Sequence, residues 1–230
     1  VCGMSGAISI IPVARIRSDF GGKFGIPRQS GVVPELRAEI IFEPDFRERD
    51  ALRGIEGFSH LWLIWGFSEN FGREWSPTVR PPRLGGNTRL GVFATRSPVR
   101  PNPLGLSCVK LEGVELSTPD GPVLRVSGAD LMDGTPIFDI KPYVPYADAH
   151  PDALGGFAAE EWERGLAVEI PPELAARFPA EKLDALRGVL AQDPRPAYQR
   201  EGGRVYGMNF AGHEIKFTVS GGVLTVTDFI

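Results

Sequence analysis

The stretch that decides the fold runs from Leu104 to Leu131 and reads LGLSCVKLEGVELSTPDGPVLRVSGADL. It contains two segments that we predict to be strands, Leu104–Leu116 and Val123–Leu131, with Pro, Asp and Gly residues between them. Short apolar segments separated by turn residues are typical of consecutive β-strands. The stretch therefore favours a fold rich in β-structure.

The rest of the first 150 residues has the same character. We predict further strands at Ala7–Arg17, Leu36–Phe42, Phe58–Phe67, Arg89–Thr95 and Ile137–Tyr143. One short helix is expected at Asp45–Arg53, because Pro44 precedes it and Gly54 can stop it. Many short strands with Gly and Pro turns indicate a barrel or a sandwich, and the lack of alternating strands and long helices disfavours a doubly wound sheet. We therefore expect a mainly β, barrel-like core.

After Tyr146 the pattern changes. Two segments, Phe157–Gly165 and Pro179–Gln192, look helical, and Leu183, Leu186 and Leu190 share one face of the second. Three strands are then expected, at Arg204–Phe210, His213–Val219 and Val223–Phe229. We predict two domains: a β-barrel over residues 1–150 and a small α+β domain over residues 151–230.

Composition limits the class of protein. The 230 residues include 25 basic and 29 acidic side chains, a net charge of −4, which argues against a surface that coats nucleic acid broadly but allows a local basic site. The two cysteines make no disulfide framework and fit a reducing compartment. No signal-peptide pattern is present, and the longest apolar run, Leu61–Phe67, is far shorter than the roughly 20 residues that span a bilayer. We expect a cytoplasmic protein without membrane contact.

Basic residues are concentrated between Ser76 and Leu111, where five arginines and one lysine occur without any acidic residue. Prolines stiffen this segment, so its guanidinium groups suit the binding of phosphates or carboxylates. Asn102 lies between Pro101 and Pro103, which restrains its backbone. The simpler interpretation, solvent-facing arginines and a turn-forming asparagine, remains open at this point.

Several familiar sites are missing from the sequence. No G-x-G-x-x-G motif follows a predicted strand and no Walker motif is present, which disfavours a Rossmann-type cofactor site. The three histidines lie far from one another and from the cysteines along the chain, so no metal site is expected. His60, beside a buried strand, fits a structural role when taken alone. Tyr143 and Tyr146 could stack on a base, and they fit a core or an interface equally well.

Four segments taken together resemble one known family. They read GFSHLW at residues 57–62, RPPRLGGN at 80–87, GVFATRSPVRPNPLGLS at 91–107 and DGTPIFDIKPYVPYAD at 133–148. This set resembles the TsaA/YaeB-like family, whose characterised members are TrmO-type tRNA (adenine(37)-N6)-methyltransferases. The segment LAQDPRPAY at residues 190–198 is similar to the C-terminal domain of that family, so the resemblance covers nearly the whole chain.

The resemblance implies a β-barrel that binds S-adenosylmethionine without a Rossmann fold and acts as a homodimer with its active sites near the subunit interface. It implies a tRNA substrate whose adenosine 37, in the anticodon loop, already carries threonylcarbamoyl on N6, mainly in threonine tRNAs. Carried over by motif, the residues implied to bind the cofactor are Pro27, Arg28, Gln29, His60, Leu61, Arg96, Leu106, Asp133, Gly134, Thr135 and Pro136.

The chemistry of the reaction suggests further roles. The modified N6 atom is a poor nucleophile and must lose a proton, so an acceptor near it would help; Asn102 is the first candidate and Asp139 the second. Arg100 or Lys141 could hold the threonyl carboxylate. The residues expected to contact RNA are Arg80, Arg83, Arg89, Lys141, Tyr143 and Tyr146. The alternatives are a methyltransferase for another substrate, a non-catalytic module that binds anticodon stems, and an anion-binding sensor.

Overall fold

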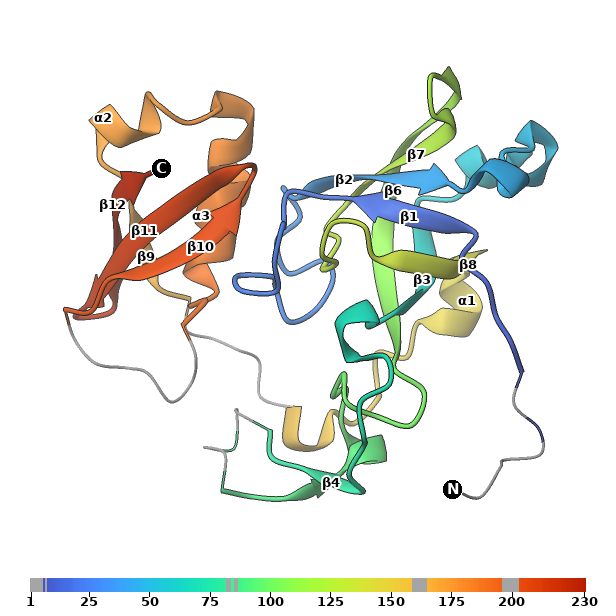
Figure 1. Ribbon diagram of the computed structural model, residues 1–230, viewed down its shortest axis with the longest axis horizontal. Helices are drawn as coiled ribbons and strands as arrows, with labels where there is room; N and C mark the ends of the chain where they lie inside the picture. The colour runs from blue at the N-terminus through green and yellow to red at the C-terminus, as the bar shows by residue number, and fades with distance from the viewer. Residues whose placement is uncertain (1–5, 7, 82–83, 85–86, 159–164, 196–202) are drawn as a thin grey trace.

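The computed structural model describes residues 6, 8–81, 84, 87–158, 165–195 and 203–230. The chain forms two lobes, a barrel and a smaller lobe built on a second sheet (Figure 1).

The first lobe is a closed antiparallel barrel with the strand order β1-β2-β7-β6-β3-β8. Its strands are β1 (Ala14–Arg17), β2 (Arg37–Phe42), β3 (His60–Gly66), β6 (Leu104–Thr118), β7 (Gly121–Ser127) and β8 (Pro136–Pro142). Closure leaves no free edge among these strands, so their backbone groups pair within the barrel. The predicted mainly β, barrel-like fold is confirmed.

Alternation of side chains explains how β2 builds this barrel. Ala38, Ile40 and Phe42 are buried in the barrel core, whereas the intervening Glu39 points outward. On the outside, Glu39 accepts a hydrogen bond of 3.0 Å from Arg17 of the neighbouring strand β1. Burial of the apolar set stabilises the barrel, at roughly 25 cal/mol per Å² of apolar surface removed from water.

Two of the predicted elements in the first lobe are wrong. The segment 89–95 is not one strand: β5 (Leu90–Gly91) pairs only with β4 (Thr78–Val79), and a 3-10 turn follows at Val92–Ala94. The Thr95 hydroxyl and amide both donate to the carbonyl of Val92, at 2.9 and 3.1 Å, and this folds the chain back.

The helix predicted at Asp45–Arg53 is likewise absent. Separate 3-10 turns occur instead at Pro44–Phe46, Arg49–Leu52 and Ile55–Gly57. Among these turns Leu52 is the one buried residue, so the segment has too little apolar surface to hold a continuous helix against the barrel. The first strand is also shorter than predicted, because β1 begins at Ala14 and not at Ala7.

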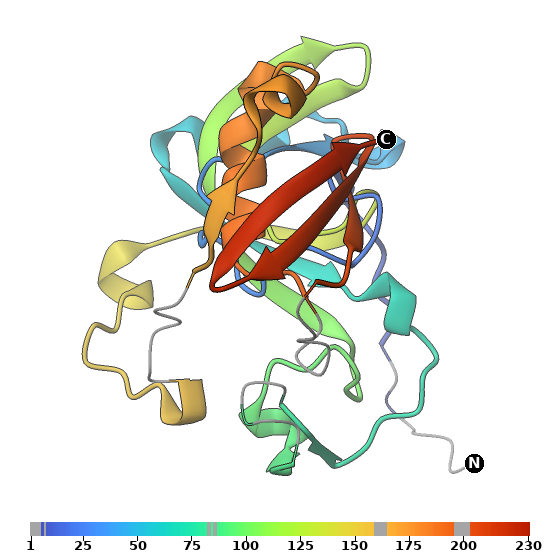
Figure 2. The same ribbon diagram turned by 90° about the vertical axis from the view of Figure 1, so that its left-hand side faces the viewer.

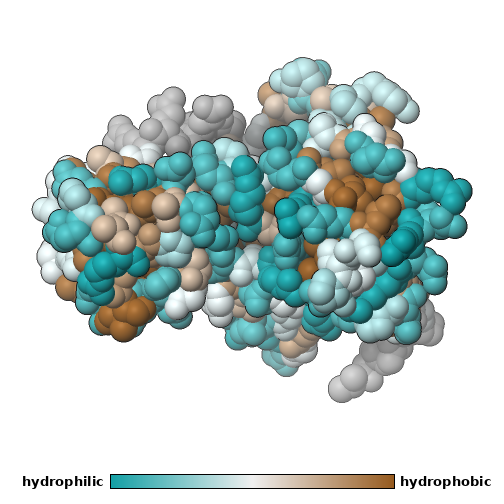
Figure 3. Space-filling view, turned by 90° about the horizontal axis from the view of Figure 1, so that it is seen from above, coloured by the Kyte–Doolittle hydropathy of each residue, from teal (hydrophilic) through white to brown (hydrophobic). Residues whose placement is uncertain are grey.

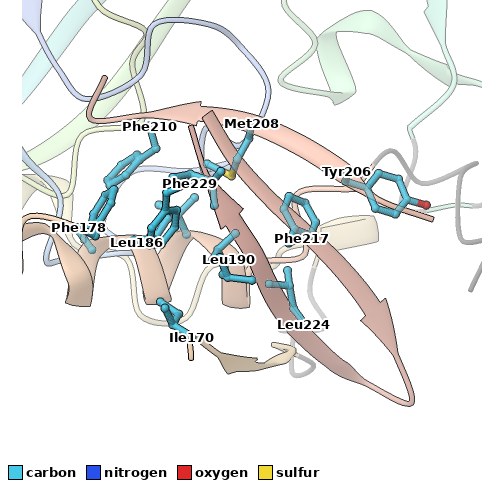
Figure 4. Close-up of a cluster of buried hydrophobic side chains, with 14 of the residues drawn as sticks. Ile170, Phe178, Leu186, Leu190, Tyr206, Met208, Phe210, Phe217, Leu224 and Phe229 are labelled. Carbon is cyan, nitrogen blue, oxygen red and sulfur yellow. The ribbon is translucent and has the colours of Figure 1, made fainter. Parts of the chain in front are cut away.

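The second lobe combines helices with a sheet, as predicted, but the sheet has a fourth strand, β9, that the sequence did not predict. The sheet has the order β10-β11-β12-β9, and β9 runs parallel to β12. Its elements are β9 (Ala167–Glu169), α2 (Pro172–Ala175), α3 (Leu183–Ala191), β10 (Tyr206–Phe210), β11 (His213–Ser220) and β12 (Val223–Phe229). Helix α3 covers one face of this sheet (Figure 2), and Leu186 and Leu190 of the helix meet Phe217 and Phe229 in a shared apolar core (Figure 4).

Two parts of the chain connect the barrel to the second lobe: the segment after β8 and the loop between β1 and β2. A short helix α1 (Pro145–Asp148) follows the barrel, and a 3-10 turn lies at Gly156–Ala158. The rest of the helix predicted at 157–165 lies mostly outside the described residues. Phe20, Val33 and Leu36, from the loop between β1 and β2, are buried in the core of the second lobe. The first 150 residues thus contribute to both cores, and the domain boundary at residue 150 stays a prediction.

Polar side chains dominate the face of the molecule that is seen from above. Seen from above, hydrophilic residues cover most of the surface, and a hydrophobic area lies on the barrel lobe (Figure 3). Among the helices that the structure describes, none is long and apolar enough to cross a membrane.

Candidate active site

A cleft of about 1290 Å³ opens where the barrel meets the second lobe. Its walls come from the loop between β1 and β2, the end of β3, the loop between β5 and β6, the first half of β6, and residues 194–195 of the second lobe. Parts of the chain that are far apart in sequence therefore share one cavity.

The floor of the cleft is a chain of hydrogen bonds. The indole of Trp65 lies over Gly105 of the adjacent strand, so closely that a Cβ at residue 105 would overlap the ring. The Nε1 of Trp65 donates to the Ser107 hydroxyl at 2.9 Å, and Ser107 donates to Oδ1 of Asp130 at 2.6 Å. Burial raises the pKa of Asp130, while the Ser107 hydroxyl and, more weakly, the charge of Arg96 act in the opposite direction.

One wall is formed by Pro27–Ser30 in the loop between β1 and β2. Arg96 donates to Oε1 of Gln29 from the opposite side, and the Gln29 amide donates to the carbonyl of Arg28. The Ser30 hydroxyl accepts a hydrogen bond of 3.1 Å from the backbone amide of Cys108 on β6. These contacts join two of the four segments that the resemblance implies to bind the cofactor, the one at Pro27–Gln29 and the one that contains Arg96 and Leu106.

The opposite wall is the proline-rich loop that leads into β6. Arg100 is half-buried and donates to the carbonyl of Thr95 at 3.2 Å, while Asn102 is exposed on the cleft side. Leu106 and Phe93 also line the cleft, with 58% and 76% of their surfaces exposed. The wall thus offers apolar surface next to a guanidinium and an amide.

The turn before β8 reaches the cleft through Thr135, which is 3% exposed. Asp133 and Gly134 stabilise the turn through their hydrogen bonds. Oδ1 of Asp133 accepts a hydrogen bond of 2.9 Å from the Ser18 amide, and the amides of Asp133 and Gly134 donate to backbone carbonyls at 2.9 and 2.8 Å. Pro136 is the first residue of β8 and is buried.

Other predicted site residues lie on a different surface. Asp139 and Lys141 form an ion pair of 2.9 Å on β8 and do not line this cleft. The rings of His60 and Tyr143 contact each other at 6.1 Å between centroids, and Tyr146 is 93% exposed on α1. The Tyr143 ring also contacts Trp62, at 5.8 Å between centroids, and Trp62 lines the cleft, so this surface adjoins the cleft.

The remaining predicted residues are scattered. The Leu61 side chain is fully buried inside the barrel. Arg80 lines the cleft. Arg89 is not among the lining residues, and its guanidinium donates to the Thr78 hydroxyl at 2.8 Å. Arg83 lies outside the described residues. In the part of the chain that the structure describes, no group of three or more His, Cys, Asp or Glu side chains is placed to hold a metal ion.

Comparison with known proteins identifies the family. A model of the tRNA-methyltransferase O N-terminal domain matches residues 15–149, and a model of the TrmO C-terminal domain matches residues 163–229. The chain belongs to the TrmO family. The earlier resemblance is thereby confirmed.

Individual TrmO-family proteins are similar over most of their length. A tRNA (adenine(37)-N6)-methyltransferase of Escherichia coli is 43% identical over 214 residues, covering 89% of this chain and 90% of that protein. A putative S-adenosylmethionine-dependent methyltransferase, RcsF, of Pseudomonas aeruginosa is 46% identical over 87% of both chains. The crystal structure of TrmO from Pseudomonas aeruginosa superimposes with a TM-score of 0.78 at 37% identity, covering 98% of this chain and 100% of that one.

One residue of this TrmO-family cleft, Asp130, had no role predicted from the sequence. Asp130 precedes the DGTP segment by three residues in an otherwise apolar stretch, a signal that could have identified it. Arg195 lines the cleft from the second lobe and is held by both carboxylate oxygens of Asp193, at 2.7 and 2.9 Å, which raises the pKa of Arg195.

Proposed function

We propose that this protein transfers the methyl group of S-adenosylmethionine to N6 of adenosine 37 in the anticodon loop of tRNA, in the cytoplasm. The preferred substrate is adenosine already modified by threonylcarbamoyl, in threonine tRNAs. One observation carries the proposal: Gln29, from the loop between β1 and β2, lines the same cleft as Arg96, Arg100, Asn102 and Leu106 of the segment that leads into β6. Membership of the TrmO family supports it.

The residues of the cleft fit S-adenosylmethionine. An adenine ring needs apolar surface, which Leu106 and Phe93 offer, and the polar ends of the molecule need donors and acceptors, which Gln29, Arg96 and Thr135 offer. Ligand pockets usually have volumes of about 300–1,000 Å³. The cleft, at about 1290 Å³, has room for more than the cofactor alone. When bound, S-adenosylmethionine supplies a methyl group on a positively charged sulfur atom.

Asn102 and Arg100 suit the acceptor nucleotide. The carbonyl oxygen of Asn102 can accept the N6–H proton in a hydrogen bond, which orients the nitrogen lone pair. Arg100 can pair with the threonyl carboxylate, and its hydrogen bond to the Thr95 carbonyl fixes the guanidinium beforehand. Arg80 and Arg89, near the same cleft, are proposed to meet tRNA phosphates.

A homodimer gives a role to the group outside the cleft. His60, Asp139, Lys141, Tyr143 and Tyr146 belong to β3, β8, the link after β8 and α1, and do not line the cleft of their own chain, although Tyr143 contacts Trp62, which does. We propose that this surface faces the partner subunit, so that its side chains complete the partner's cleft. A mixed dimer of an Asn102→Ala chain with a Lys141→Ala chain then regains one intact cleft and part of the activity.

The experiment that tests the function uses purified protein, cofactor labelled in the methyl group, and threonine tRNA with or without threonylcarbamoyl. We expect label in the N6-methylated nucleoside of the modified tRNA, and little in the unmodified tRNA. A non-catalytic binding module would retain the tRNA and transfer no label. A methyltransferase for another substrate would bind the cofactor and leave both tRNAs unlabelled.

A further inference from the structure

The cleft is lined by more cationic than acidic side chains. Among the described residues that line it, the cationic ones are Lys23, Arg28, Arg80, Arg96, Arg100 and Arg195. The acidic lining residues in the same described part of the chain are Glu69 and Asp130. Such a surface suits tRNA phosphates, but it repels the positively charged sulfur of the proposed cofactor. A carboxylate inside the cleft is therefore needed to accept that charge.

The two acidic residues differ in their surroundings. The side chain of Glu69 is 54% exposed, and its carboxylate lies 3.7 Å from the ammonium of Lys23 at the rim. Asp130 is mostly withdrawn from water at the floor of the cleft. A carboxylate in a site with little water interacts with a nearby cation more strongly than an exposed one does. Asp130 is the better placed of the two.

Asp130 is also held in a fixed orientation. Ser107, which is 1% exposed, donates to Oδ1 of Asp130, and Trp65, 7% exposed, donates to Ser107. Both supporting side chains come from barrel strands, β6 and β3, that are hydrogen-bonded to each other. A carboxylate supported in this way loses little freedom when a ligand binds.

We propose that Asp130 binds the positive charge on the sulfur of S-adenosylmethionine, and that it thereby favours the methylated cofactor over the spent one. The inference rests on the proposed function. Methyl transfer leaves S-adenosylhomocysteine, whose sulfur is neutral, so the attraction to Asp130 ends when the reaction is complete. Because the charge is already decreasing in the transition state, this interaction stabilises bound cofactor more than it stabilises the transition state.

The test compares wild type with Asp130→Asn by calorimetric titration. Three ligands are used: S-adenosylmethionine, S-adenosylhomocysteine, and sinefungin, which carries a charged amine where the methylated sulfur would be. We expect the two charged ligands to bind Asp130→Asn about tenfold more weakly and the neutral one to bind within twofold of wild type, about 1.4 kcal/mol of selective loss. In steady-state assays the KM for cofactor should rise, and kcat should not fall and should rise up to severalfold, because the variant loses more stabilisation of bound cofactor than of the transition state.

Controls make the outcomes decisive. Glu69→Gln removes the other carboxylate of the cleft, and we expect it to leave the ratio of the three affinities unchanged. Equal weakening of all three ligands by Asp130→Asn would show a merely structural role and overturn the inference, as would three unchanged affinities. If Asp130→Asn does not fold, Asp130→Ser gives the same comparison. A wild-type protein that binds none of the three ligands would instead overturn the proposed function itself.

Discussion

The ammonium of Lys182 lies 2.6 Å from Oδ2 of Asp19, and the two side chains are only 28% and 15% exposed. Lys182 directly precedes α3 in the second lobe, whereas Asp19 begins the loop that carries Pro27–Ser30 into the cleft. The backbone amide of Ala211 donates to the Asp19 carbonyl at 2.9 Å. The second lobe therefore holds one wall of the cleft in place.

This contact predicts that Lys182→Met weakens cofactor binding although residue 182 lies outside the cleft. The change leaves Asp19 partly buried without its cationic partner, and we expect a loss of about 1–3 kcal/mol of folding stability. Cofactor affinity should fall severalfold, because the loop of the cleft wall is less ordered. Thermal unfolding and calorimetric titration measure the two effects.

A matched control exists inside the second lobe. Arg177 and Asp228 form an ion pair of 3.4 Å with side chains 58% and 46% exposed. Arg177→Met should cost little stability, about 1 kcal/mol or less, and should leave cofactor affinity unchanged. Equal losses of cofactor affinity in both variants would mean that the second lobe affects cofactor binding through overall stability and not through the loop between β1 and β2.

The packing of Trp65 on Gly105 gives the second prediction. Gly105→Ala places a methyl group where the indole lies, which must displace the ring and break its hydrogen bond to Ser107. We expect a loss of about 1–3 kcal/mol, read from urea unfolding, together with a changed tryptophan fluorescence. Gly113→Ala on the same strand meets no heavy atom within 4 Å and is the control. A native-like spectrum for Gly105→Ala would contradict this packing.

The carboxylate of Asp148 gives a prediction about pH. It accepts hydrogen bonds from the Val144 amide at 2.8 Å and the Trp62 indole at 3.0 Å, and these hold the pKa of Asp148 below its ordinary value of 3.8. Because the folded-state pKa is lowered, this stabilisation is present above the ordinary pKa and is lost as the pH falls through the folded-state value. The stability difference between wild type and Asp148→Asn should therefore shrink on acidification. A difference that grows as the pH falls would contradict the assignment.

Arg80 and Arg89 predict the salt dependence of tRNA binding. If each meets one phosphate, replacing either with Ala should lower the slope of log affinity against log salt by about 1. Cofactor affinity should not change. Arg15→Ala, which breaks an ion pair of 2.7 Å with Glu43 on the outer barrel wall, serves as the control. An unchanged slope for both the Arg80 and the Arg89 variant would place the tRNA phosphates elsewhere.

Asn102 predicts a change in turnover. Since its amide is proposed to orient the N6 lone pair through a hydrogen bond, Asn102→Ala should lower kcat at saturating tRNA by about 10²–10³-fold, the range for loss of one hydrogen bond positioned for the transition state. Binding of tRNA and cofactor should be nearly unaffected. Single-turnover kinetics with labelled cofactor measures the step directly. Unchanged turnover at saturating tRNA would remove Asn102 from this role.

Local patterns predicted the strands well, and the reason is visible in β12. The strand predicted at Val223–Phe229 has the same bounds in the structure, since buried and less buried residues alternate along it. The strand predicted at residues 89–95 was wrong because the conformation there depends on the Thr95 hydroxyl, which closes a turn by donating a hydrogen bond to the Val92 carbonyl. An apolar run does not reveal such a bond.

The candidate site was predicted only where it lies in contiguous motifs. Arg96, Arg100 and Asn102 stand in one stretch of unusual composition, and all three line the cleft. Asp130 depends on Ser107, 23 residues away in sequence, and the Asp19–Lys182 contact joins residues 163 apart. Pairings at such separations arise from the closure of the barrel and the docking of the second lobe, which periodicity along the chain cannot show.

The proposed function is methylation of N6 in threonylcarbamoyladenosine 37 of tRNA. The most direct measurement is mass spectrometry of the nucleosides of purified threonine tRNA, from cells with the gene, without it, and with the gene restored. We expect the N6-methylated form to disappear on deletion and the unmethylated threonylcarbamoyl form to accumulate, and we expect the restored gene to reverse both changes. Persistence of the methylated nucleoside in the deletion strain would contradict it.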